Sequence, residues 1–140
     1  MVQRRRVGRH LVLDNQAVSA LLRGPAVERR LVIEALAAAD GGSVVPSAVR
    51  VEAGWDRRAG LAASANRLVS DDDVLDGRGA DRAAELRASV AGASVVDACV
   101  AVAAERAAAQ GGPVEILTSD PLDMAALAAH LEGRFEVRPL

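Results

Sequence analysis

The sequence predicts an α/β fold, a three-layer α/β/α sandwich with a short, mostly parallel central sheet. Short apolar runs are typical of buried strands, and the segments between them carry the spacing of helices. Gly, Pro and Asp mark most of the boundaries. Because strands that alternate with helices form βα units, the sheet is expected to be covered on both faces. The chain of 140 residues fits a single domain, and no linker or internal repeat divides it.

The first half of the chain is expected to contain two strands and four helices. Ser47 is predicted to cap the third helix and Gly60 to stop it. The strands are predicted over 11–13 and 43–46, and the helices over 16–22, 26–39, 47–58 and 61–68.

The second half begins with residues 69–75, which fit neither a helix nor a strand clearly and contain three successive aspartates. The helix predicted over 95–110 is almost wholly apolar, so it is expected to have no solvent face. Helices are predicted over 81–90, 95–110 and 121–131, and strands over 114–118 and 135–137.

The composition excludes several kinds of chemistry. All 17 basic residues are Arg, so the chain has no Lys for a P-loop or a Schiff base. One Cys excludes an internal disulfide, and two His residues leave little room for a His-rich zinc site. The net charge of -2 argues against a protein that coats nucleic acid through a global positive field.

The N-terminus is expected to be a basic, flexible segment over residues 1–9. Its arginines are Arg4, Arg5, Arg6 and Arg9, which are either solvated or in contact with RNA phosphates. No apolar run approaches the length of about 18 residues that a membrane span needs. A cytoplasmic protein without a membrane segment is therefore expected.

Acidic residues follow the predicted strands, at the positions where parallel sheets bind their ligands. Asp14 ends the first strand, and Asp120 follows the strand over 114–118. Glu52 lies in the helix after the second strand, and Asp97 opens the long apolar helix. Because ligands bind beyond the carboxyl ends of parallel strands, these side chains are expected to converge.

Each acid also has a purely structural interpretation. Asp14 and Asp120 suit helix N-caps, and a proline follows Asp120. Asp97 resembles the last member of a capping box that begins at Ser94. Asp123 lies in the first turn of its helix, where a carboxylate favours the helix dipole. Capping explains each acid taken alone, but it does not explain why they gather at one edge.

Glu52 is expected to face the apolar core. Val51, Trp55 and Ala59 stand at helical spacing from it, so it shares the apolar stripe of its predicted helix. A carboxylate that faces a core needs a partner, a proton or a metal.

The acidic cluster points to a bound cation. Clustered carboxylates repel one another unless a cation lies among them. Hard oxygen ligands suit Mg²⁺ or Mn²⁺, which also bind substrate phosphates. The combination predicts metal-assisted hydrolysis of a phosphodiester, in which the metal activates a water.

At this point the sequence resembles the PIN-domain ribonucleases, in particular the VapC-type toxins of bacterial toxin–antitoxin modules. The resemblance extends from about residue 11 to residue 137. It is carried by the segments Leu11-Val-Leu-Asp14, Val51-Glu52-Ala53-Gly54-Trp55, Val95-Val96-Asp97-Ala98 and Leu117-Thr118-Ser119-Asp120-Pro121-x-Asp123. One departure is that Asn15 and Gln16 follow the first Asp, where the family often has a small residue and then Ser or Thr.

The resemblance implies a single PIN-like domain over 1–140 with the activity of an Mg²⁺- or Mn²⁺-dependent endoribonuclease. It also implies a homodimer and inhibition by a cognate antitoxin protein, as in a type II toxin–antitoxin system. The catalytic acids carry over as Asp14, Glu52, Asp97 and Asp120, of which Asp14, Asp97 and Asp120 are expected to hold the metal. The supporting polar groups around them are Glu52, Thr118, Ser119, Asp123 and Gln16. The candidates for contact with RNA phosphates are Arg50, Arg57 and Arg58, whose alternative is a solvated helix face.

Two rival functions differ in what they require of the sequence. A phosphatase of the haloacid-dehalogenase type needs a second Asp two residues after the first, where this chain has Gln16, and it also uses a Lys. The rival from outside the enzymes is a non-catalytic PIN-like binding module, whose acidic pocket holds an Arg of a partner protein. Binding of Mn²⁺ and loss of cleavage in an Asp97→Asn variant distinguish the nuclease from this module.

Overall fold

The computed structural model describes residues 8–140, and the part of the predicted basic segment that contains Arg4, Arg5 and Arg6 lies outside the described residues. The described chain forms a sheet of five parallel strands in the order β3-β2-β1-β4-β5. The strands are β1 (His10–Leu13), β2 (Gly42–Pro46), β3 (Asp72–Asp73), β4 (Val114–Thr118) and β5 (Phe135–Pro139).

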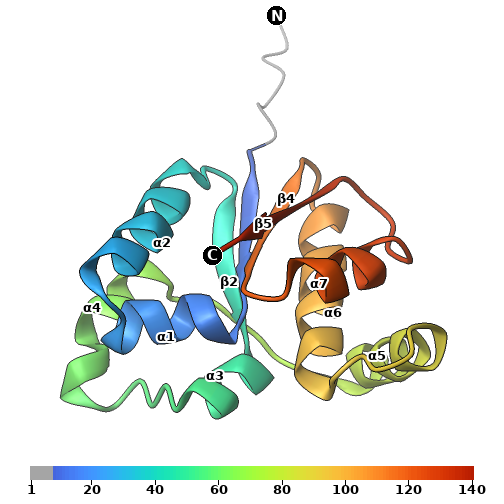
Figure 1. Cartoon of the computed structure of the whole chain (residues 1–140), viewed down its shortest axis with the longest axis horizontal. Helices are drawn as coiled ribbons and strands as arrows, with labels where there is room; N and C mark the ends of the chain where they lie inside the picture. Colours follow the sequence, from blue (N-terminus) through green and yellow to red (C-terminus); the bar gives the residue numbers. More distant parts are fainter. Residues whose placement is uncertain (1–7) are drawn as a thin grey trace, which may run out of the picture.

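Helices cover both faces of this sheet, which confirms the predicted three-layer α/β/α architecture of a PIN-like fold. The first two helices lie on one side of the sheet, and the last two lie on the other side (Figure 1). The helices are α1 (Asn15–Arg23), α2 (Ala26–Ala38), α3 (Ser47–Ala53), α4 (Ala63–Leu68), α5 (Gly77–Ser89), α6 (Val95–Ala109) and α7 (Pro121–Ala128), with a 3-10 turn η1 (Gly60–Ala62) before α4.

The core lies where β1 and β4 pack against α6. Leu11, Val12 and Leu13 of β1 are fully buried, as are Ile116 in β4 and the middle of α6. The buried residues of α6 are Ala98, Cys99, Val100, Ala101, Val102, Ala103, Ala104 and Ala107. This confirms that most of the helix has no solvent face. Within residues 8–140, no helix combines the length and the apolar character that a membrane span requires.

Several predicted element boundaries are wrong, among them the end of the last helix, which stops at Ala128 and not at residue 131. The third helix does not reach residue 58, because Gly54 adopts a left-handed conformation with φ of 69° and ends α3 at Ala53. Ser47 is its first helical residue rather than its N-cap. The fifth helix begins at Gly77, four residues before its predicted start, where Asp76 caps it. Residues 72–73 of the ambiguous segment form β3 at the edge of the sheet.

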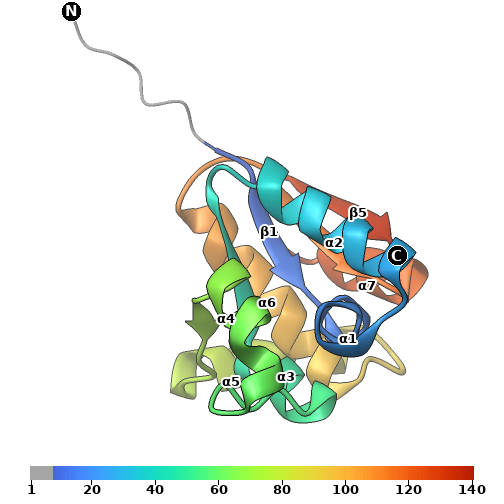
Figure 2. The same cartoon turned by 90° about the vertical axis from the view of Figure 1, so that its left-hand side faces the viewer.

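The strand order places a topological switch point between β1 and β4. From β1 the chain builds outward to β2 and β3, and then it crosses to the other side of β1 to add β4 and β5. The register pairs Leu13 at the end of β1 with Leu117 near the end of β4. Figure 2 shows that β1 runs directly into α1 at this end of the sheet. Open α/β sheets bind ligands at such switch points, so the residues after β1 and β4 form the candidate site.

Candidate functional site

Asp14 lies at the switch point and connects the ends of the two central strands. Its carboxylate Oδ1 accepts hydrogen bonds from the backbone N–H groups of Gln16 at 3.1 Å and Ala17 at 3.3 Å. Its Oδ2 accepts a bond from the backbone N–H of Ser119 at 3.2 Å. Asp14 therefore caps α1, as its structural interpretation expects, and it also holds the residue that follows β4.

Asp14 is buried, with only 5% of the residue exposed. Burial raises the pKa of Asp14 above its ordinary value, and the bonds from Thr118 and from the backbone N–H groups act in the opposite direction. The Thr118 hydroxyl is fully buried, and it also accepts the backbone N–H of Asp120 at 3.0 Å. Thr118 thus connects Asp14 to Asp120 through one hydroxyl group.

Asp120 occupies the N-cap position of α7, but its side chain makes no capping hydrogen bond in the described chain. Pro121 begins the helix, so one of the four unpaired N–H groups of a helix start is missing. Asp120 and Asp123 are both exposed. The capping interpretation therefore does not account for the Asp120 carboxylate, which is available to a ligand.

Asp97 lies in the first turn of α6 and is half-buried. The Ser94 hydroxyl accepts the backbone N–H of Asp97 at 3.0 Å, so the predicted cap at Ser94 is present. Burial raises the pKa of the Asp97 carboxyl, and the negative charges of Asp120, Asp14 and Asp123 raise it further. Asp97 therefore lies within electrostatic range of Asp14, Asp120 and Asp123, and these four residues form the aspartate cluster.

Glu52 does not face the core, so that prediction is wrong. That prediction depended on an apolar stripe along a longer helix, and two residues of the stripe, Trp55 and Ala59, lie beyond the end of α3. Glu52 is exposed, and 83% of the neighbouring Val51 is exposed as well. Its carboxylate Oε1 accepts a hydrogen bond from Asn15 Nδ2 at 3.1 Å. Glu52 is therefore connected to the aspartate cluster through Asn15, the neighbour of Asp14.

The predicted RNA-contact arginines are not together on a helix face. Arg50 and Arg57 both bind the carboxylate of Asp72, each at 2.7 Å. Arg57 also lies over the ring of Trp55, with its guanidinium carbon 4.5 Å from the ring centroid. Arg58 lies in the following loop with 90% of its side chain exposed, and it pairs with Asp56. Two of the three arginines therefore hold β3 against the segment after α3.

The side chains of the aspartate cluster offer carboxylate oxygens, which are the ligands that a hard divalent cation prefers. Carboxylate oxygens that repel one another, as the raised pKa of Asp97 indicates, are relieved by such a cation. Within residues 8–140, however, no three His, Cys, Asp or Glu side chains stand close enough to hold a metal as they are placed. Binding of a cation by these residues therefore requires side-chain movement or bridging waters.

Asn15 is the residue at this site that the sequence reasoning missed. Its side chain donates to Glu52, while its own Oδ1 atom is buried without a hydrogen-bond partner among the described residues. The departure from the family pattern directly after Asp14 was the signal that marked this position. The predicted Gln16 contributes its backbone N–H to Asp14.

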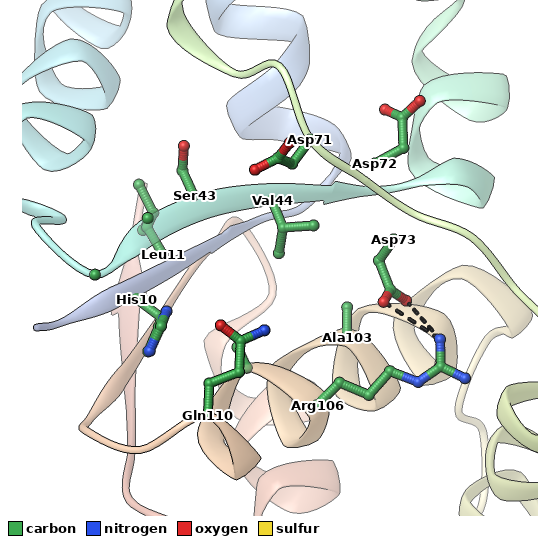
Figure 3. Close-up of a pocket in the computed structure, with 13 residues that line it drawn as sticks. His10, Leu11, Ser43, Val44, Asp71, Asp72, Asp73, Ala103, Arg106 and Gln110 are labelled. Carbon is green, nitrogen blue, oxygen red and sulfur yellow. Dashed lines mark hydrogen bonds and ion pairs between the residues drawn. The ribbon is translucent and has the colours of Figure 1, made fainter. Parts of the chain in front are cut away.

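A separate cavity of about 320 Å³ lies at the opposite end of the strands, between β2 and α6. Figure 3 shows His10, Ser43 and Asp71 around it, together with the ion pair between Asp73 and Arg106. Because it borders the first residues of β1 and β2, this cavity is not part of the aspartate cluster.

One of three comparisons with known proteins supports the fold. No protein-family model matches the chain, and no curated protein matches it. A solved structure, the VapBC2 complex from Rickettsia felis bound to a DNA fragment from its promoter, contains a chain of similar fold. The TM-score is 0.56 and the sequence identity is 11%, over 91% of this chain and 98% of that chain. The predicted PIN-like α/β architecture is confirmed at the level of the fold.

Proposed function

We propose that this chain is an Mg²⁺- or Mn²⁺-dependent endoribonuclease and the toxin of a type II toxin–antitoxin module. The observation that carries the proposal is the cluster of Asp14, Asp97, Asp120 and Asp123 at the switch point of the sheet. The Asp120 carboxylate has no capping role to explain it. The likeness in fold to a chain of a VapBC2 complex supports the same proposal.

In this proposal Asp14, Asp97 and Asp120 hold the cation. When bound, Mg²⁺ or Mn²⁺ supplies an activated water and neutralises charge on the scissile phosphate. Asp14 is fixed by three backbone N–H groups, so it defines one side of the site. Asp120 is exposed and is the side chain with the freedom to turn inward.

The neighbouring polar groups orient these acids and the substrate. The Thr118 hydroxyl fixes the Asp14 carboxylate relative to the Asp120 backbone. Asp123 adds negative charge beside them. Glu52 orients the attacking water or binds the cation through a water. The exposed hydroxyl of Ser119 and the amide of Gln16 are available to a phosphate oxygen. Among the three predicted arginines, Arg58 has the most exposed guanidinium for an RNA phosphate.

The proposal also includes two protein partners, a second copy of the chain and an antitoxin. Apolar side chains that a monomer leaves in water support contacts between chains: Val27 on α2 is 74% exposed and Leu61 on η1 is 91% exposed. Both lie within residues 26–68, the region that we propose for the dimer contact. Light scattering on the purified chain distinguishes a dimer from a monomer.

The test of the proposed activity is cleavage of an end-labelled RNA pool with and without Mn²⁺. We expect cleavage only with Mn²⁺ and a loss of at least about 100-fold in the Asp97→Asn variant, because metal-site acids supply much of the charge stabilisation. Asp81→Asn is the matched control, since Asp81 is an exposed aspartate on α5, outside the cluster. Calorimetric titration measures the affinity for Mn²⁺ of the natural chain, Asp97→Asn and Asp81→Asn.

Cleavage that survives in Asp97→Asn at the rate of Asp81→Asn would overturn the assignment of the site. Binding of an Arg-containing partner without cleavage of any RNA would favour the non-catalytic binding module.

A further inference from the structure

The two asparagines of this chain are in opposite situations. Both side-chain atoms of Asn66 have partners: Oδ1 accepts from Trp55 Nε1 at 2.9 Å and from Arg57 at 3.3 Å, and Nδ2 donates to the Arg57 carbonyl at 2.7 Å. Asn15 has a partner on one side only. Its Nδ2 donates to Glu52 Oε1 at 3.1 Å, and its Oδ1 is buried with no partner in residues 8–140.

The chemistry of Glu52 fixes the orientation of the Asn15 amide. An ionised carboxylate only accepts hydrogen bonds, so the NH₂ group of Asn15 must face it and the carbonyl must face inward. Exchanging the two amide atoms would place two acceptors against each other and bury a donor instead. The inward carbonyl destabilises the fold, because it has lost its hydrogen bonds to water and accepts none from the protein in residues 8–140. A residue at this position with no inward acceptor would avoid that loss.

The function of Asn15 accounts for this unfavourable arrangement. Glu52 lies on the seven-residue helix α3 and is exposed, so its side chain would otherwise be free to turn in solvent. Asn15 directly follows Asp14, which is rigidly held. We propose that Asn15 is a positioning residue that holds the Glu52 carboxylate beside the aspartate cluster, at the expense of its own unsatisfied carbonyl. This inference deepens the proposed function and rests on it.

Thermal unfolding without metal tests the structural half of the inference. The Asn15→Ala variant is expected to melt within about 2 °C of the natural chain or above it, because an unsatisfied acceptor is removed. The matched variant Asn66→Ala is expected to melt at least about 3 °C lower, because it leaves buried donors without partners. A loss in Asn15→Ala as large as the loss in Asn66→Ala would overturn the inference, since Asn15 would then be a stabilising residue.

Side-chain amide resonances test the contact itself without any metal. In the ¹⁵N–¹H spectrum, Glu52→Ala is expected to move the NH₂ resonances of Asn15 and to leave those of Asn66 in place. Unmoved Asn15 resonances would mean that the contact is absent in solution, and the inference would be wrong.

A double-mutant cycle tests whether Asn15 acts through Glu52. Mn²⁺ affinity is measured for Asn15→Ala, Glu52→Ala, the double variant and Asn66→Ala. We expect each of the first two changes to weaken binding about 10-fold, as supporting residues of metal sites do, and the double variant to be no weaker than Glu52→Ala. Asn66→Ala is expected to bind as the natural chain does. Fully additive losses would overturn the positioning role.

The outcomes separate this inference from the proposed function. A natural chain that binds no Mn²⁺ and cleaves no RNA contradicts the proposed function, while the melting temperatures and amide resonances still decide whether Asn15 holds Glu52.

Discussion

A carboxylate among other carboxylates is easier to protonate in the folded chain than in the unfolded chain, and Asp97 is such a group. Its pKa is raised above the ordinary value of 3.8, first by burial and then by Asp120, Asp14 and Asp123. Between 3.8 and the raised pKa, the folded chain binds more protons than the unfolded chain does. The stability contributed by this group therefore falls as the pH rises through that range, and it stays lost at neutral pH.

Asp97→Asn is therefore expected to stabilise the metal-free chain at pH 7. The gain should disappear near pH 3, about where the aspartate is protonated in both states. Urea unfolding followed by circular dichroism at the two pH values measures the difference. Saturating Mn²⁺ should reverse the order at pH 7, because a ligand of the folded state stabilises the natural chain more than the variant. A variant that is less stable than the natural chain at pH 7 without metal would contradict the electrostatic account.

Glu115 shows how a charge is accommodated inside the sheet. It lies in the middle of β4 and is 2% exposed, although the surrounding strand is apolar. Arg9 and Arg138 each bind one of its carboxylate oxygens, at 3.2 Å and 3.1 Å. Because both arginines are half-exposed, only the carboxylate depends on the pairing for its solvation.

This asymmetry makes the two sides of the ion pair unequal under mutation. Arg138→Ala is expected to destabilise the chain by about 1–3 kcal/mol, because the buried carboxylate keeps a single partner. Glu115→Met is expected to change stability by less than about 1 kcal/mol, because it removes the buried charge and leaves the arginines to water. Urea unfolding of both variants measures the difference, and a larger loss in Glu115→Met would contradict the explanation.

Individual site residues were predictable to the extent that chain topology decides their place. Asp14 and Asp120 follow strands, so the parallel sheet alone brings them to one edge. Glu52 reaches the same edge, but the reason predicted for it is wrong, because helical spacing is meaningful only while the helix continues. The role of Asn15 was hidden, since whether an amide atom has a partner depends on contacts between distant segments.

Among the elements, the predictions are wrong at two kinds of place. In one, glycines lie inside the first turn of a helix, and in the other, a turn ends a helix before its apolar pattern ends. Gly77 and Gly79 suggest a loop, yet α5 begins there because Asp76 caps the Gly79 N–H at 2.8 Å. A Cβ on Gly79 would meet Arg106 Nη2 at 2.7 Å, so the end of that arginine would have to shift to accept a side chain there. The apolar strand β1 and the long helix α6 were predictable because burial on all sides produces uninterrupted apolar runs.

The end of α3 gives a testable prediction for a single element. Gly54 has φ of 69°, a left-handed conformation that is unfavourable for residues with a Cβ. Gly54→Ala is expected to destabilise the chain by about 1–2 kcal/mol. The nearest atom to the new Cβ would be Arg23 Nη2 at 3.7 Å, so the effect comes from the backbone and not from a clash.

Gly60→Ala is the matched control for this element. Gly60 is not one of the described glycines with a positive φ, and a Cβ added to it would meet open space. Its stability is expected to stay within about 0.5 kcal/mol of the natural chain or to rise. Denaturant unfolding of both variants tests the pair, and equal losses would show that the left-handed conformation is not the cause.

For the whole molecule, the geometry of the site depends on how α6 packs. This helix contacts β1, β2 and β4 on the sheet side and α3, α5 and α7 on the other sides, and it carries Asp97 in its first turn. It fits there because alanines dominate its buried positions, so the neighbouring backbones approach closely. An alanine-rich composition thus has a structural consequence, whatever its origin.

A larger side chain within α6 should therefore disturb both the fold and the site. Ala104→Leu adds three carbons at a fully buried position and is expected to destabilise the chain by about 1–3 kcal/mol, because the core has no room for them. Ala109→Leu makes the same change at the exposed end of the helix and is expected to have an effect below about 0.5 kcal/mol. If α6 moves away from the sheet, Asp97 moves with it, so Ala104→Leu should also weaken Mn²⁺ binding while Ala109→Leu should not. Calorimetric unfolding together with Mn²⁺ titration measures both effects. Unchanged Mn²⁺ affinity in a destabilised Ala104→Leu variant would show that the position of Asp97 is set by Ser94 and the first turn alone, independently of the packing of the helix.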